Sequence, residues 1–69
     1  MQPTYPNPAK NNITIEVDNF ENAFIYNLTG QVVLQSRSKS IDVSNLTNGL
    51  YIIRVIANGA SLSSKVIKE

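Results

Sequence analysis

Apolar and polar residues alternate along several short stretches of this 69-residue chain. In residues 13–17 the apolar residues Ile13, Ile15 and Val17 are separated by polar ones, which is the pattern of a half-buried strand. No stretch carries the apolar stripe with a period of about 3.6 residues that indicates a helix. We predict further strands over residues 23–26, 31–35, 40–43, 50–57 and 61–68.

Turn residues join these strands into hairpins. Residues 27–30 read Asn-Leu-Thr-Gly, with the glycine where a positive φ is needed, so residues 23–35 are predicted to form a hairpin. Asn58 and Gly59 form the strongest hairpin signal in the chain. Short strands that recur every ~8–12 residues are typical of a sandwich. We therefore predict an all-β fold, a small antiparallel immunoglobulin-like β-sandwich of about seven short strands.

The stretch from Leu50 to Ala57 is apolar at nearly every position except Arg54. Such a run is typical of a strand that is covered on much of both faces. The preceding Gly49 is expected to have a positive φ, or to be closely approached by a neighbouring segment. The side chains expected to be mostly buried are Ile13, Ile15, Ile25, Val33, Ile41, Leu46, Tyr51, Ile53 and Val55.

Composition and charge exclude several classes of protein. The net charge is +1 and the lysines and arginines are scattered, which argues against a nucleic-acid partner. No apolar run is long enough to span a membrane, and no basic start with an apolar region indicates a signal peptide. There is no cysteine, so no disulfide supports a domain that is expected to be only marginally stable at this size.

Candidate catalytic residues are few. The sequence has no histidine and no cysteine, so its serines lack a base and a catalytic triad is excluded. Glu16 and Asp18 could share one face for acid–base chemistry, but we interpret them as part of a solvated strand edge. Asp18, Asn19 and Glu21 could bind calcium, although no regular ligand loop is present. We therefore predict no enzymatic activity, no cofactor and no metal site.

Two further patterns each allow two interpretations. Triplets of the N-glycosylation type begin at Asn12, Asn27 and Asn45, but all three lie at or beside predicted turns, where Asn and Thr bond to the backbone. The aromatic residues could form a sugar-binding platform, although packing in or beside the core is the preferred interpretation. These residues are Tyr5, Phe20, Phe24, Tyr26 and Tyr51.

Longer segments carry a more specific pattern. The first, YPNPAKNNITIEV, contains Pro6, Asn7 and Pro8. Its prolines fix φ and remove two backbone donors, so this lead-in is predicted to be extended and to resist further pairing as an edge strand. The second segment, FIYNLTGQVVL, places Gly30 in the central hairpin.

The third segment, IDVSNLTNGLYIIRV, has Leu46, then Gly49, then Tyr51 ahead of alternating apolar residues. The chain ends in SSKVIKE, with Lys65 and Lys68 in the last predicted strand. In this order and at this spacing, the segments resemble the type A C-terminal sorting domain of the type IX secretion system of Bacteroidota. The resemblance extends over nearly the whole chain.

The resemblance implies a fold and a role. Members of that family are antiparallel β-sandwiches of about seven strands, which agrees with the strand pattern. They are non-catalytic signals that direct a fused N-terminal passenger, through shuttle components, to the type IX outer-membrane translocon, where a sortase-like protease cuts them off. The implied location is the periplasm in transit, then the outer membrane, the cell surface or the extracellular space. The sequence departs from the family pattern at Thr47, where a proline is common, and at the additional Glu69.

We interpret residues 1–4 as a linker remnant or an added start and residues 5–69 as the sorting domain. The rival hypothesis is an immunoglobulin-like accessory module that binds a carbohydrate or a cell-surface partner, and a structural spacer is a third. None of them involves nucleic acid or membrane insertion. A transport receptor must read exposed features, so the final strand is the leading candidate, with edge protection by its lysines as the alternative. The candidate recognition residues are Pro6, Asn7, Pro8, Gly30, Leu46, Gly49, Tyr51, Lys65 and Lys68.

Overall fold

The computed structural model describes residues 4–5 and 9–69. This part of the chain contains seven strands and no helix, so the all-β prediction is confirmed. The first strand has only two residues, whereas the last two have nine each. The strands are β1 (Thr4–Tyr5), β2 (Asn12–Ile15), β3 (Phe20–Tyr26), β4 (Val32–Ser36), β5 (Ser40–Asp42), β6 (Gly49–Ala57) and β7 (Ala60–Lys68).

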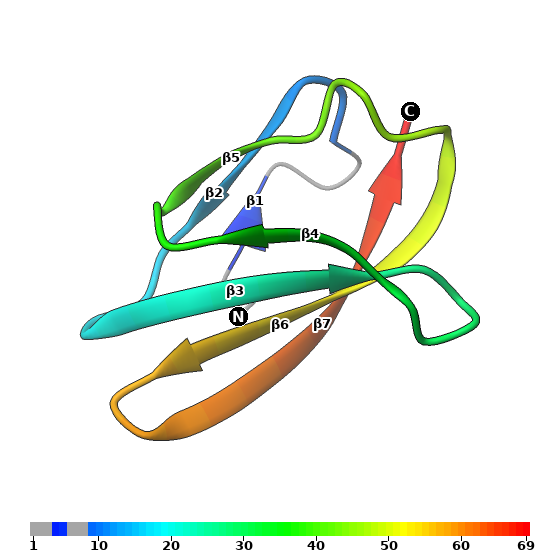
Figure 1. Cartoon of the computed structure of the whole chain (residues 1–69). Coiled ribbons are helices and arrows are strands. Elements are labelled where there is room, and N and C mark those ends of the chain that lie inside the picture. Colours follow the sequence, from blue (N-terminus) through cyan, green and yellow to red (C-terminus); the bar gives the residue numbers. More distant parts are fainter. Residues whose placement is uncertain (1–3, 6–8) are drawn as a thin grey trace.

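The strands form two sheets that enclose the core (Figure 1). One sheet has three strands in the order β1-β2-β5, and the other has four in the order β4-β3-β6-β7. All strand pairs are antiparallel. An immunoglobulin domain pairs its strands A, B and E in one sheet and C, F and G in the other. When the strands are lettered in chain order, β1, β2 and β5 correspond to A, B and E and lie in one sheet. Strands β3, β6 and β7 correspond to C, F and G and lie in the other, so the immunoglobulin-like prediction is confirmed.

The core lies between the inner faces of the two sheets. It is built from side chains that alternate along each strand, because successive residues of a strand point to opposite faces. Of the nine residues expected to be buried, seven are: Ile13, Ile15, Ile25, Ile41, Tyr51, Ile53 and Val55. The other two, Val33 and Leu46, are partly buried and pack against this cluster.

Two irregularities in the sheet explain where the start of β3 and the burial of Val33 differ from the prediction. The strand predicted to begin at residue 23 begins at Phe20, because the β3–β6 register shifts between Phe20 and Asn22 and interrupts the alternation there. A second shift, in the β3–β4 pair, leaves Val33 between the partners of Tyr26 and Ile25. This position accounts for the partial burial of Val33, since a bulged residue does not keep to one face.

The two predicted hairpin turns are confirmed, and each uses an asparagine. The Oδ1 of Asn27 accepts hydrogen bonds from the backbone N–H groups of Thr29 (3.1 Å) and Gln31 (3.0 Å), and Gly30 has φ of 89°. The side chain of Asn27 thus serves the turn, as the interpretation of the glycosylation triplets expects at this position. Asn58 and Gly59 have φ values of 52° and 75°, which are the two positive values that a type I′ turn requires.

Gly49, at the start of β6, has φ of 152°, so the predicted positive φ is confirmed. No heavy atom lies within 4 Å of the point that a Cβ would occupy, so the alternative of a close approach does not apply. The described residues contain no helix long and apolar enough to cross a membrane.

Candidate functional site

The outer edge of β7 is the surface to which the sequence directs attention, because it carries Lys65 and Lys68. The strand lies at the end of the four-stranded sheet and pairs with β6 along its whole length, from Ala60 opposite Ala57 to Lys68 opposite Gly49. Figure 1 shows this long hairpin at the lower side of the view, with β7 coloured from orange to red. One backbone edge of β7 therefore faces away from β6.

Ala9 covers the final part of this edge. Its N–H donates to the carbonyl of Ile67 (2.7 Å), and its own carbonyl accepts from the N–H of Glu69 (2.8 Å). These contacts form an isolated parallel bridge between Ala9 and Lys68. Ala9 is fully buried, so the chain before β2 closes the end of the sandwich at this point.

The first part of the edge is open. In an antiparallel pair, the backbone N–H and C=O of every second residue point away from the partner strand. Ile67 and Glu69 point away from β6 toward Ala9, so Ser61 and Ser63 also point away from β6 on this edge. Neither serine forms a backbone hydrogen bond on that side with any residue that the structure describes. The edge is thus closed by Ala9 at one end and available for pairing at the other.

The two lysines of β7 occupy opposite faces of the sheet. Lys65 is exposed and lies opposite Ile52, whereas Lys68 is buried, with an exposed fraction of 7%. The expectation that Lys68 is an exposed, readable feature is therefore wrong. Lys68 is two residues after the buried Val66 and therefore points to the same face of the sheet. Its aliphatic stem packs inward, while its Nζ donates to the backbone oxygen of Glu69 (3.0 Å).

Leu46 lies in the connection from β5 to β6, and Gly49 and Tyr51 lie in the first residues of β6 that follow it. The hydroxyl of the buried Tyr51 donates to the carbonyl of Thr47 (2.7 Å), four residues upstream. Immunoglobulin-like domains have a similar tyrosine at this corner, which bonds back to the preceding backbone. In this structure Leu46 and Tyr51 hold the connection in place and offer little exposed surface to a receptor.

The remaining candidates are placed elsewhere or cannot be placed. Gly30 lies in the β3–β4 turn, outside the β5–β6 connection. Pro6, Asn7 and Pro8 lie outside the described residues, so their roles stay predictions. Thr4–Tyr5 forms β1 at the edge of the three-stranded sheet, which fits the edge position expected for the lead-in.

One surface was missed by sequence reasoning, namely the outer face of β6. The run from residue 50 to 57 was expected to be covered on much of both faces, but only the inner positions are buried. On the outer side Leu50 and Arg54 are exposed, and Ile52 and Ile56 are partly buried. The prediction of cover on both faces is wrong for the described part of the chain, because no element lies on the outer side of this sheet. The signal in the sequence was that apolar residues occupy successive positions of this strand, and therefore both of its faces.

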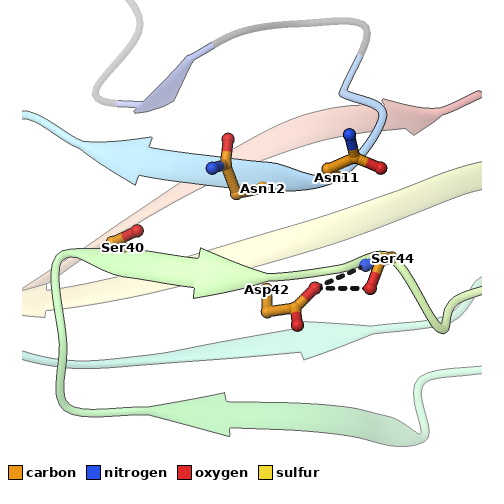
Figure 2. Close-up of a pocket in the computed structure, with 5 residues that line it drawn as sticks. All are labelled: Asn11, Asn12, Ser40, Asp42 and Ser44. Atoms are coloured by element: carbon orange, nitrogen blue, oxygen red, sulfur yellow. Dashed lines mark hydrogen bonds between the residues drawn. The ribbon is translucent and has the colours of Figure 1, made fainter.

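A polar hollow crosses the three-stranded sheet (Figure 2). Asn12 of β2 and the preceding Asn11 line one side of the hollow. The other side is lined by Ser40 and Asp42 of β5 and by Ser44 in the turn that follows. Asp42 accepts hydrogen bonds from the hydroxyl (2.6 Å) and the N–H (2.9 Å) of Ser44, and these bonds lower the pKa of its carboxyl group. The carboxylate is thereby committed to the turn, and the described residues that line the hollow include no second titratable group.

The residues considered for calcium also serve the backbone. The Oε2 of Glu21 accepts from the N–H of Gly59 (2.8 Å), and the carbonyl of Asn19 accepts from the N–H of Asn58 (3.1 Å). Among the described residues, no three His, Cys, Asp or Glu side chains are grouped so that they could hold a metal ion.

Comparison with known proteins adds a family to this geometry. The family model described as "Secretion system C-terminal sorting domain" matches residues 3–69. Beta-agarase D of Zobellia galactanivorans is 35% identical over 66 residues, which cover 91% of this chain and 14% of that protein. An ulvan lyase of Nonlabens ulvanivorans is 41% identical over 61 residues, 78% of this chain and 11% of the lyase. The chain thus spans only a small part of the curated relatives that it matches, and no solved structure matches it.

Proposed function

The chain belongs to the family of secretion system C-terminal sorting domains, and from this membership we propose that it directs a passenger protein to the type IX translocon of the outer membrane. Domains of this family are non-catalytic sorting signals on larger secreted proteins. The observation that carries the proposal is the family match over residues 3–69. It is supported by relatives whose matched part is only 14% and 11% of their length.

We extend the proposal to the steps of export. The passenger crosses the periplasm, the domain is delivered by shuttle components to the translocon, and a sortase-like protease cuts the domain off. The passenger then reaches the cell surface or the extracellular space. The division into a linker remnant at residues 1–4 and a sorting domain at residues 5–69 remains part of this proposal.

The open edge of β7 supports a physical means of recognition. A receptor strand added beside Ser61 and Ser63 would gain main-chain hydrogen bonds, which provide affinity without depending on sequence. Side chains beside the added strand provide selectivity, and Lys65 is an exposed side chain of β7. The buried Lys68 contributes through the fold, because its stem lies in the end of the sandwich that Ala9 closes.

The test is a secreted reporter with residues 1–69 fused to its C-terminus, expressed in a bacterium with a type IX system. We expect the reporter at the cell surface or in the medium only when the domain is present. Retention of the reporter inside the cell both with and without the domain, with the domain shown to be folded, would contradict the sorting function.

The role of the lysines is tested in the same fusion. We expect Lys65→Ala to lower the exported fraction while circular dichroism and thermal unfolding stay unchanged, because Lys65 is exposed. Lys39→Ala is the matched control, since Lys39 is also exposed but lies before β5, away from the edge. Lys68→Ala is expected to lower the melting temperature as well as export. Normal export of folded Lys65→Ala and Lys68→Ala variants would mean that the lysines only protect the strand edge and are not part of the export signal.

A further inference from the structure

The outer face of the four-stranded sheet carries an apolar surface that strand addition at the β7 edge does not use. Each of its residues lies opposite another outward-pointing residue in the sheet register, for example Tyr26 opposite Ile52 and Leu50 opposite Ile67. Their neighbours along the strands, such as Ile25 and Ile53, are the buried ones. The apolar members of this outer face are Phe24, Tyr26, Val32, Leu50, Ile52, Ile56 and Ile67.

The other sheet shows what a solvated face of this domain looks like. The outward positions of β2 and β5 hold Asn12, Thr14, Ser40 and Asp42, all of them polar. An antiparallel sheet with one face in water alternates apolar and polar residues in this way. On the four-stranded sheet Leu50 and Ile67 are instead exposed at 38% and 46%. A contiguous exposed apolar surface of this kind marks an interaction site.

The charge on the outer face defines the chemistry of its partner. Arg54 projects from the middle of β6, opposite Phe24 on one side and Ser63 on the other, and Lys65 is opposite Ile52. No carboxylate occupies an outward register position of the four strands, and no described residue forms an ion pair with Arg54. Glu21, which the bulge of β3 leaves out of the register, has its carboxylate hydrogen-bonded to the N–H of Gly59. Arginine surrounded by apolar and aromatic side chains is typical of interface centres, and its guanidinium binds a carboxylate through two parallel hydrogen bonds.

Two other occupants fit this face less well. A second copy, packed face to face, would bring two sets of positive charges together, and neither copy has a carboxylate in an outward register position to offset them, which is unfavourable. Recognition of an anionic lipid surface uses clusters of about four to eight basic residues, and this face offers two. A protein surface with acidic and apolar side chains meets both requirements of the face.

We propose that the outer face of the four-stranded sheet is a docking surface for a protein that presents a carboxylate among apolar side chains, with Arg54 as the residue that binds this carboxylate. The contact lies on a sheet face and is independent of strand addition at the β7 edge. It rests on the proposed function and deepens it, because it adds a second surface that export requires beside the edge.

The test places a photo-crosslinking phenylalanine analogue at position 52 of the exported fusion in living cells. Thr14 is the matched control position, because it is also partly buried on the outside of a sheet, but of the polar one. We expect a discrete protein adduct from position 52 and none from position 14. Arg54→Glu should reduce the adduct at least about 30-fold, the loss expected when a desolvated charge pair is broken. Circular dichroism of each labelled variant confirms that it is folded.

The partner is then identified by mass spectrometry, and the carboxylate nearest the crosslink is changed to lysine. Restoration of the adduct with the Arg54→Glu variant supports the proposal, and failure to restore it for every acidic residue at the contact overturns it. An adduct of the fusion with itself, or no adduct together with co-sedimentation of the purified domain on phosphatidylglycerol vesicles, also overturns it. The absence of both an adduct and vesicle binding also overturns the proposal. Export of the unlabelled fusion is measured in parallel, so failure of the sorting function is detected separately.

Discussion

The two sheets of this domain have similar inner faces and very different outer faces. Inside, both contribute fully buried β-branched side chains, such as Ile13 from the three-stranded sheet and Ile53 from the four-stranded one. Outside, the three-stranded sheet is polar at its described strand positions, whereas the four-stranded sheet is largely apolar. The four-stranded sheet also has the longest strands and a partly open edge.

This difference separates what folds the domain from what other molecules can read. The core needs only one apolar face from each sheet, and the three-stranded sheet provides no more than that. The apolar outer residues of β6 add nothing to that core, so their presence needs another explanation. Recognition at the outer face and at the β7 edge provides one, and both features belong to the four-stranded sheet.

The largest expected effect distinguishes the two faces of β6 itself. Ile53→Ala removes a fully buried side chain and should lower the free energy of unfolding by about 2–5 kcal/mol. Ile52→Ala, one residue away on the outer face, should cost less than about 1 kcal/mol because that side chain is already partly in water. Urea unfolding followed by circular dichroism measures both. Equal losses for the two variants would mean that the outer face is part of the folding core.

A smaller loss of stability is expected from a substitution at the first residue of β6. Gly49→Ala should destabilise the domain by about 1 kcal/mol or more, because alanine is strained at a φ of 152°. The space around the glycine is open, so the cost comes from the backbone and not from a clash. Ser63→Ala, an exposed change in β7, is the control and should alter the thermal midpoint very little. An unchanged midpoint in Gly49→Ala would show that the start of β6 can relax.

The smallest effect concerns the polar sheet. The hydroxyl and N–H of Ser44 hold the pKa of Asp42 below its ordinary value in the folded state. The folded pKa is below the unfolded one, so this contribution to stability is present above the unfolded pKa and is lost as the pH falls through the folded pKa. Ser44→Ala should raise the pKa of Asp42 in an NMR titration of the folded domain. The same pKa in both proteins would show that the bonds to Ser44 are not made in solution.

Much of this fold could be predicted because its strands follow simple rules. Alternation at Ile13 and Ile15 and the turn residues Asn58 and Gly59 fix local structure directly, so β2 and the last hairpin were found. The early start of β3 was not, since a bulge beside Phe20 interrupts the pattern. The bridge made by Ala9 joins residues far apart in the chain, which no local pattern reports.

The candidate site could be predicted only in outline. The sequence indicates a last strand with two lysines, but alternation alone does not reveal that Lys68 is buried and bridged to Ala9. Tyr51 was considered for recognition, and its hydrogen bond to Thr47 shows that it stabilises the corner before β6. The outer face needed the structure, because apolar residues at both parities are equally compatible with a strand buried on both sides.

The most direct measurement of the account is the exported fraction of a reporter fused to two doubly substituted domains. One combines Ile52→Ser with Arg54→Glu on the outside of the four-stranded sheet, and the other combines Thr14→Ala with Ser40→Ala on the outside of the three-stranded sheet. Both must first give the circular dichroism spectrum of the unsubstituted domain. The account predicts that the Thr14 and Ser40 variant is exported at the normal level and that the Ile52 and Arg54 variant accumulates inside the cell. Normal export of both folded variants would contradict the claim that export requires a partner at the outer face of the four-stranded sheet.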